Sequence, residues 1–298
     1  MNSAPRQTLR CIVILLLLTT VGQGWAKEKS VGVLISREIV PYVAMVEGLE
    51  SRIHDPVQRF FLDEEGKPYS LGGRNATLNP QMFDALVAVG PEALHYLKTQ
   101  AGSTPLVYGM VLNPDNVVDD PQKMPCGVSL NIPAAAQFSS ILQHIPDLKR
   151  LGVLFDPGNN QAWFKSAAVV AADRGFDLIP LQVSRQGGRL NMVGEFARLD
   201  AILFIPDKSI ISKAVIQYVI KQGVINNTPV IGYNQFFADS GAAFNFLIDY
   251  QRVGQQVAAQ VELLLAGEKC EEAVSSKYEA VINEEVWQSM MKKRRTED

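Results

Sequence analysis

The sequence is poor in the residue types that most often build metal sites and nucleophilic centres. Its 298 residues include three cysteines and three histidines, and the histidines lie in or beside predicted helices without metal-ligand spacing. It contains no Gly-x-Ser-x-Gly elbow, no Gly-x-x-x-x-Gly-Lys loop, and no Gly-x-Gly-x-x-Gly after the first predicted strand. We therefore expect no catalytic residue, no metal and no cofactor.

An excess of basic residues is also missing. The chain carries 28 Lys and Arg against 31 Asp and Glu, a net charge of −3, and no basic face stands out. Nucleic acid is therefore not an expected partner. Beyond residue 26 there is no apolar run long enough to span a bilayer.

The first 26 residues have the layout of a secretory signal peptide. Arg6 and Arg10 precede the apolar run CIVILLLLTTV, and Gly24 and Ala26 supply small residues for cleavage after Ala26. The alternative is an uncleaved membrane anchor. Because the two arginines are the only charges in this segment, the mature chain would hold 26 basic and 31 acidic residues, a net charge of −5.

Short β-branched runs alternate with segments of helical periodicity along the rest of the chain. This alternation is typical of a parallel sheet covered by helices on both faces. Three strand motifs recur in the same order: Gly-Val-Leu at 32–34 and 152–154, FDALVAVGPEAL at 83–94 and LDAILFIPDKSI at 199–210, and STPLVYGMV at 103–111 and NTPVIGYNQ at 227–235. Their offsets of 120, 116 and 124 residues predict two domains of the same α/β build. The alternative is that all buried parallel strands resemble one another, since all are rich in Val, Ile and Leu.

Ligands of parallel α/β sheets bind beyond the carboxyl ends of the strands, where helix N-termini present backbone N–H groups. Two such domains facing each other would form a cleft. The candidate ligand-binding residues directly follow predicted strands: Ser36, Arg37, Gly90, Pro91, Glu92 and Tyr108 in the first half, and Asp156, Asn159, Asn160, Asp207, Lys208, Tyr233 and Asn234 in the second. Each also fits an ordinary turn or helix cap. Glu92 and Asp207 could form a catalytic carboxylate pair, but we favour their holding a cationic part of a ligand.

The segments RLGVLFDPGNN, LDAILFIPDKSI, NTPVIGYNQ and FLIDYQRVGQQVAAQVELLLAGE resemble the ABC-transporter substrate-binding proteins. The resemblance is to the subfamily whose members include binders of tryptophan and other aromatic amino acids. It implies the α/β periplasmic-binding-protein type 1 fold, with two Rossmann-like lobes that have parallel-sheet cores and are joined by a hinge of three crossings. It places the signal peptide at 1–26, the first lobe at 27–127 with 246–275, and the second at 128–245 with 276–298.

The resemblance can be carried over position by position. Asp156–Asn160 matches the family's Tyr-Asn-Pro-Gly loop, and Pro206–Lys208 matches its Pro-Thr-Asp-Asn cleft turn. Tyr233 and Asn234 match the loop after the next strand. Asp249 matches an acidic residue five positions before a helix glycine, here Gly254, and so joins the ligand-binding candidates.

The first lobe departs from the family pattern. Val89-Gly90-Pro91-Glu92 stands where Ala-Thr-Pro-Ser is frequent, and Ser36-Arg37-Glu38 replaces a His-Pro segment. Arg37 would then hold a ligand carboxylate, and Tyr42, Tyr108 and Tyr233 would stack on a flat ligand. The family's crossings lie close together, so the resemblance also implies a disulfide between Cys126 and Cys270 that staples the hinge.

These observations predict a periplasmic, monomeric receptor without catalysis. It would capture a small solute, such as an amino acid or another small carboxylate, by hinge closure and deliver it to an ABC permease in the inner membrane. One alternative is a ligand-sensing module for a membrane kinase or chemoreceptor. Another is a periplasmic enzyme that uses Glu92, Asp156 or Asp207.

Overall fold

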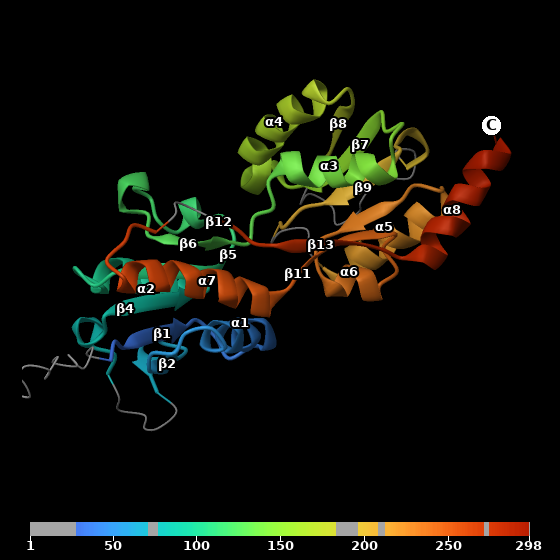
Figure 1. Cartoon of the computed structure of the whole chain (residues 1–298). Coiled ribbons are helices and arrows are strands. Elements are labelled where there is room, and N and C mark those ends of the chain that lie inside the picture. Colours follow the sequence, from blue (N-terminus) through green and yellow to red (C-terminus); the bar gives the residue numbers. More distant parts are fainter. Residues whose placement is uncertain (1–27, 71–76, 183–195, 208–211, 271–273, 298) are drawn as a thin grey trace, which may run out of the picture.

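The computed structural model describes residues 28–70, 77–182, 196–207, 212–270 and 274–297. The predicted signal peptide and Lys208 lie outside these ranges. Figure 1 shows two lobes side by side, connected where the chain passes repeatedly from one to the other. No helix in the described ranges is long and apolar enough to cross a membrane.

The first lobe is built on a seven-stranded sheet that is parallel except at the β2–β3 edge. Its strands lie in the order β12 (Val274–Ser275), β6 (Cys126–Ser129), β5 (Leu106–Val111), β4 (Ala85–Val89), β1 (Val31–Ile35), β2 (Val57–Leu62) and β3 (Pro68–Tyr69). Three helices pack on this sheet: α1 (Val40–Glu50), α2 (Pro91–Gln100) and α7 (Tyr250–Leu265). Two 3₁₀ turns, η2 (Pro114–Asn116) and η3 (Pro121–Lys123), follow β5.

The second lobe repeats this plan with six strands, parallel except at the β11–β13 edge. The order is β13 (Tyr278–Ile282), β11 (Phe244–Ile248), β10 (Val230–Gly232), β9 (Ala201–Phe204), β7 (Arg150–Phe155) and β8 (Asp177–Gln182). Its helices are α3 (Ala134–His144), α4 (Pro157–Asp173), α5 (Lys213–Ile225), α6 (Gln235–Asp239) and α8 (Glu284–Glu297). In Figure 1, α3 and α4 lie on one side of this sheet and α6 on the other. The orders β6-β5-β4-β1-β2 and β11-β10-β9-β7-β8 correspond strand for strand, so the predicted pair of α/β lobes with parallel-sheet cores is confirmed.

The central strand β1 shows why these runs are continuously apolar. All five of its residues are buried. Val31, Val33 and Ile35 pack with α1 and α7 on one face of the sheet, whereas Leu34 packs with α2 on the other. Since successive side chains of a strand point to opposite faces, a strand covered on both sides needs apolar residues at every position.

The repeated Asp-Ala motif makes the same hydrogen bonds in both lobes. The Asp84 carboxylate accepts a hydrogen bond from the backbone N–H of Ser30 at 2.9 Å. The Asp200 carboxylate accepts one from the backbone N–H of Arg150 at 2.8 Å. In each lobe the aspartate thus ties the start of β4 or β9 to the start of the neighbouring β1 or β7.

The repeated Thr-Pro motif is equivalent as well. Thr104 Oγ donates to the carbonyl of Pro80 at 3.2 Å, and Thr228 Oγ donates to the carbonyl of Phe196 at 2.9 Å. These carbonyls belong to corresponding 3₁₀ turns, η1 (Pro80–Met82) and η4 (Phe196–Arg198). Each threonine therefore ties the segment before β5 or β10 to the turn that precedes the neighbouring strand.

The repeated glycine of Gly-Val-Leu has a packing reason in both lobes. A Cβ on Gly32 would lie 2.8 Å from the ring of Phe83, and a Cβ on Gly152 would lie 2.7 Å from a methyl group of Leu199. Both distances are too short for real Cβ contacts. The motif at residues 32–34 and 152–154 is therefore a true structural repeat, in which glycine makes room for the same neighbouring position.

The chain crosses between the sheets in three short segments. These are residues 130–133 between β6 and α3, Asp249 between β11 and α7, and residues 276–277 between β12 and β13. The lobe boundaries expected at residues 127, 245 and 275 stay predictions. The strands run slightly past the first two, because β6 continues in the first sheet to Ser129 and β11 in the second sheet to Ile248.

A disulfide joins Cys126 to Cys270 across 144 residues of sequence, with the Cα atoms 6.1 Å apart. Cys126 opens β6, and Cys270 precedes β12, which pairs with β6 in the first sheet. The bond therefore ties together, within the first lobe, the two segments from which the first and third crossings leave. It does not join one lobe to the other.

Helices α1 and α7 pack backbone to backbone at a pair of glycines. A Cβ added to Gly254 would overlap the carbonyl oxygen of Met45, and a Cβ added to Gly48 would overlap the carbonyl oxygen of Gln251. Because backbone atoms cannot rotate away as a flexible side chain can, only glycine permits this approach. The glycine five residues after Asp249 is thus required for packing.

We predict that Gly254→Ala destabilises the protein by about 3 kcal/mol, the upper range for overpacking, although alanine is normally the better helix former. The matched control is Gln255→Ala on the exposed face of the same helix, which should change stability little. Denaturant unfolding of the two variants measures the difference. Equal stabilities would show that α1 and α7 can separate without cost.

Candidate ligand-binding site between the lobes

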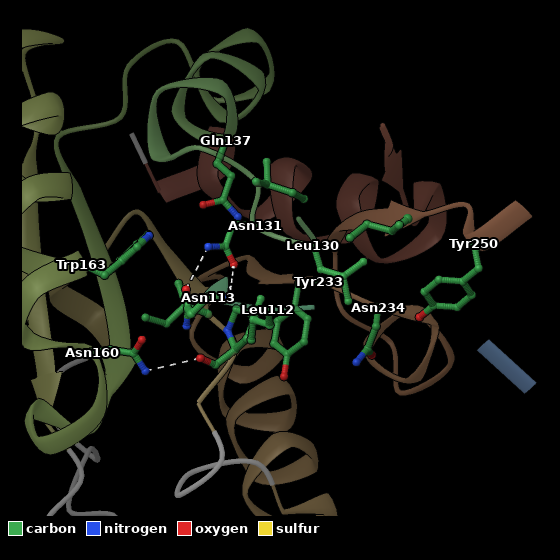
Figure 2. A pocket seen from close by; sticks show the side chains of 14 residues that line it. Leu112, Asn113, Leu130, Asn131, Gln137, Asn160, Trp163, Tyr233, Asn234 and Tyr250 are labelled. Atoms are coloured by element: carbon green, nitrogen blue, oxygen red, sulfur yellow. Dashed lines mark hydrogen bonds between the residues drawn. The ribbon is translucent and has the colours of Figure 1, made fainter. Parts of the chain in front are cut away.

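A cavity of about 160 Å³ lies where the two lobes and two of the crossings meet. Figure 2 shows side chains from both lobes directed toward it. Its lining residues come from the ends of strands, the starts of helices and the crossings: Leu112, Asn113, Leu130, Asn131, Ile132, Gln137, Asn160, Trp163, Ile205, Pro206, Tyr233, Asn234, Ile248 and Tyr250.

Two asparagines hold the first crossing in place at the cavity wall. Asn131 Nδ2 donates to Asn113 Oδ1 at 2.9 Å, and the backbone N–H of Asn113 donates to Asn131 Oδ1 at 3.1 Å. Asn113 adopts a left-handed conformation with φ of 49°, which asparagine tolerates better than most residues. Figure 2 shows this pair at the centre of the site. The pair binds the first crossing to the segment that leaves β5.

The Asp207 carboxylate organises the second-lobe side of the cavity. It is buried and accepts hydrogen bonds from the backbone N–H of Asp156 at 2.8 Å, from Asn159 Nδ2 at 3.1 Å and from Asn160 Nδ2 at 2.8 Å. The loops after β7 and β9 are thereby joined at the point where the strand order reverses, which is where open α/β sheets bind ligands. Asp156 in turn caps α4 by accepting from the N–H of Gly158 at 2.8 Å.

Two tyrosines at the cavity remain uncharged at neutral pH. Burial raises the pKa of the Tyr233 phenol above its ordinary value, and the nearby Asp207 carboxylate and Tyr250 raise it further. Burial also raises the pKa of Tyr250. Both phenols therefore stay protonated and offer neutral hydroxyl groups to whatever occupies the cavity.

The first-lobe candidates Ser36, Gly90 and Pro91 build the start of α2. Ser36 Oγ accepts a hydrogen bond from the backbone N–H of Ala93 at 2.9 Å, and Pro91 is the first residue of the helix. Gly90 has φ of +92°, and a Cβ there would lie 2.6 Å from Ser36 Oγ. These three residues do not line the cavity.

Arg37 and Glu92 pair with each other. Their side chains form an exposed ion pair with an N–O distance of 2.5 Å. Glu92 and Pro91 also border a separate surface hollow together with His95 and Tyr96. An exposed pair of this kind contributes little stability because water and salt screen it.

Tyr108 lies inside the first lobe. Its side chain is fully buried in the cluster that packs α2 on the sheet, and its hydroxyl has no hydrogen-bond partner among the described residues. Burial raises the pKa of this phenol to about 12, with a further contribution from Asp115. Tyr108 is not part of the cavity lining.

We predict that Tyr108→Phe stabilises the protein by about 1 kcal/mol, because it removes a buried hydroxyl that lacks a partner. The folded pKa of about 12 lies above the unfolded value of 10.0. Below pH 10 the phenol is neutral in both the folded and the unfolded protein, and stability falls as pH rises from 10 toward 12, because only the unfolded phenol ionises there. Unfolding of both proteins between pH 7 and 12 should show less alkaline loss in Tyr108→Phe. A lower stability at pH 7 would mean that the hydroxyl has a partner.

Asp249 and Asn234 cap the helices that begin at the site. Asp249 accepts from the backbone N–H groups of Gln251 at 3.0 Å and Arg252 at 3.2 Å, at the second crossing. Asn234 Oδ1 accepts from the N–H of Phe237 at 3.3 Å. Asp249 is therefore the N-cap of α7.

The structure thus sorts the sequence-based candidates by location. Asn160, Tyr233 and Asn234 line the cavity, and Asp156, Asn159 and Asp207 support its second-lobe wall. The remaining described candidates lie elsewhere in the first lobe or at the second crossing, and Lys208 lies outside the described residues. Gln137, Trp163 and Tyr250 also line the cavity, although none of them directly follows a predicted strand or was expected from the sequence. All three lie in the first two turns of α3, α4 or α7, the helices that begin at a crossing or after a strand, and that position was the available signal.

Residues 74–291 match the family model described as ABC transporter substrate binding protein. The chain belongs to this family. No curated relative matches the sequence. Within the described residues, no group of three or more His, Cys, Asp or Glu side chains could hold a metal ion.

Several solved structures share the fold of this substrate-binding protein. One is an ABC domain in complex with L-Trp from Streptococcus pneumonia, with 20% identity, a TM-score of 0.58, and coverage of 89% of this chain and 95% of that one. Another is a ligand-free, open substrate-binding protein with adhesive properties from Clostridium difficile, with 16% identity, a TM-score of 0.67, and coverage of 88% and 95%. A third is an ABC transporter solute-binding protein with bound myo-inositol from Bacillus halodurans, with 14% identity, a TM-score of 0.50, and coverage of 90% and 99%. The periplasmic-binding-protein type 1 fold is confirmed.

Proposed function

We propose that this chain is an exported receptor that captures a small molecule between its lobes and delivers it to an ABC permease, without catalysis. The observation that carries the proposal is the cavity shared by both lobes. Its walls come from segments that follow strands of both sheets and from residues at two of the crossings, so a ligand there contacts both lobes, which move relative to each other when a hinge closes. A ligand that makes more contacts in the closed form shifts the population toward closure.

Exposed apolar side chains on both lobes support such a movement. Ile39 and Val40, at the start of α1, are 43% and 82% exposed, and Phe236 on α6 is 38% exposed. These residues follow β1 and β10, at the carboxyl edges of the two sheets. We propose that closure buries these apolar side chains between the lobes, which would favour the closed form once a ligand fills the cavity.

The disulfide supports export. Disulfides persist in oxidising compartments and are rare in the cytosol. The bond between Cys126 and Cys270 therefore fits a periplasmic protein, as does the layout of residues 1–26, for which cleavage after Ala26 is predicted. The permease in the inner membrane is the partner that family membership implies.

Export can be tested directly on the full chain expressed in a Gram-negative host. We expect the protein in the periplasmic fraction. Mass spectrometry should show Lys27 as its N-terminal residue. Alkylation without reductant should leave Cys126 and Cys270 unmodified, and alkylation after reduction and unfolding should modify both. Retention of residues 1–26, or two thiols that react without reductant, would contradict the proposal.

Capture by closure is tested by small-angle X-ray scattering of the exported protein, unfolded and refolded with its disulfide intact to remove any bound ligand. We expect a binding compound to reduce the radius of gyration. The same compound at a hundredfold excess over its Kd should stabilise the protein by about 2.7 kcal/mol. Stabilisation without compaction would contradict the closure mechanism. Conversion of the compound into a product, followed by chromatography, would favour an enzyme.

A further inference from the structure

Arg252 of α7 connects the first lobe to the second by an ion pair. Its guanidinium lies 3.3 Å from the Asp249 carboxylate at the second crossing and 3.2 Å from the Glu279 carboxylate of β13. Helix α7 packs on the first sheet, whereas β13 is an edge strand of the second sheet. The contact between Arg252 and Glu279 therefore spans the two lobes beside the crossings, where a hinge rotation is centred.

Hydrogen bonds hold the third crossing to its neighbours. The Gln256 side chain of α7 donates through Nε2 to the carbonyl of Ser275 at 3.1 Å and accepts at Oε1 from the backbone N–H of Lys277 at 3.0 Å. The backbone N–H of Ser276 donates to the carbonyl of Ser129, at the end of β6, at 2.9 Å. The third crossing is thus fixed to α7 and to the start of the first crossing, which suits these segments to act as a pivot.

Arg252 and Glu279 lie on the side of this pivot that faces away from the cavity. Tyr250 lines the cavity, and a side chain two residues further along a helix points about 200° away, because a helix has 3.6 residues per turn. Glu279 pairs with Leu247 in the register of β13 and β11, whereas the next residue of β11, Ile248, lines the cavity. Since successive side chains of a strand point to opposite faces, Glu279 lies on the face away from the cavity.

A contact behind a hinge opposes closure of the cleft in front of it. When the lobes rotate about the crossings so that the cavity side narrows, the opposite side widens. Arg252 stays with the first lobe, because α7 is packed against α1 through Gly254, whereas Glu279 moves with the second sheet. The two side chains are 53% and 60% exposed, so the pair is screened by water and can break at low cost.

We propose that Arg252 and Glu279 form a latch behind the hinge, which stabilises the open arrangement of the lobes and sets how readily the receptor closes. This inference rests on the proposed receptor function. The open arrangement is the one described here, in which Val40 and Phe236 at the carboxyl edges of the two sheets are exposed. Because closure breaks the latch, the latch lowers the apparent affinity for any ligand by the same factor without touching the ligand.

The latch is tested by single-molecule fluorescence energy transfer between the lobes of the exported and refolded protein at low salt. The dyes are attached to Met82→Cys in the first lobe and Val169→Cys on α4 in the second, two exposed positions. In Glu279→Gln the closing rate should rise about twofold to fivefold, the range expected for an exposed ion pair. The opening rate should not change, because the pair is already broken in the closed form.

Glu262→Gln is the matched control. It removes the exposed ion pair between Glu262 and Arg52, which involves the same helix but lies within the first lobe. Both rates should therefore stay as they are in the original protein.

Charge reversal gives a stronger effect. Arg252→Glu places like charges behind the hinge, so repulsion should raise the closing rate further than Glu279→Gln does. An acidic residue in the first turn of a helix is favourable, so α7 should remain folded. Arg252→Glu combined with Glu279→Arg restores an ion pair and should return the closing rate toward the original value. High salt should speed closing of the original protein more than that of Glu279→Gln, because screening weakens the intact pair.

Three outcomes would contradict the latch. If Glu279→Gln closes at the original rate, the inference is overturned, while the opening and closing of the lobes still supports the receptor function. If it closes more slowly, the pair belongs to the closed form and the inference is again wrong. If the distance between the lobes is constant in every protein, including the unrefolded protein with any compound that it carries from the cell, then closure itself is refuted. The proposed capture mechanism then fails together with the latch.

Discussion

The backbone contact between α1 and α7 determines where the two lobes are joined. Gly48 and Gly254 bring these helices so close that no side chain fits between them at that point. Since α7 begins directly after the second crossing, its position on the first sheet also fixes Asp249 and Tyr250. A contact made by side chains could adjust by rotation, whereas a contact between backbones cannot. The cavity wall at Tyr250 therefore inherits its position from a pair of glycines in the same lobe.

Because of the duplication, each lobe has its own set of equivalent contacts that hold its sheet together. In both halves an aspartate ties the starts of the two central strands, a threonine ties the next strand to a 3₁₀ turn, and a glycine leaves room for the residue before that aspartate. All of these contacts lie within one lobe. Short crossings and the packing beside them connect the lobes, which is the arrangement expected for two bodies that rotate about a hinge.

The polar groups at the cavity divide into those that support the walls and those that face the ligand. Asp207 and the Asn113–Asn131 pair hold loops of different elements together and use their hydrogen-bonding capacity for that purpose. Tyr233 and Tyr250 line the cavity with neutral phenols. A site in which most polar groups are occupied is rigid before the ligand arrives, and this preorganisation lowers the cost of binding. Specificity is then left to few groups.

The sequence by itself determined the strands and the duplication, because burial on both faces and close packing each require particular residues at nearby positions. It also favoured the pairing of Cys126 with Cys270 through a family resemblance. It did not determine which loop residues meet. Tyr108 follows the pattern of a cleft residue, yet its side chain is buried with α2. Gln137 reaches the cavity because α3 starts at a crossing. Contacts between segments distant in sequence depend on how sheets, helices and crossings pack together, and only the tertiary structure decides that.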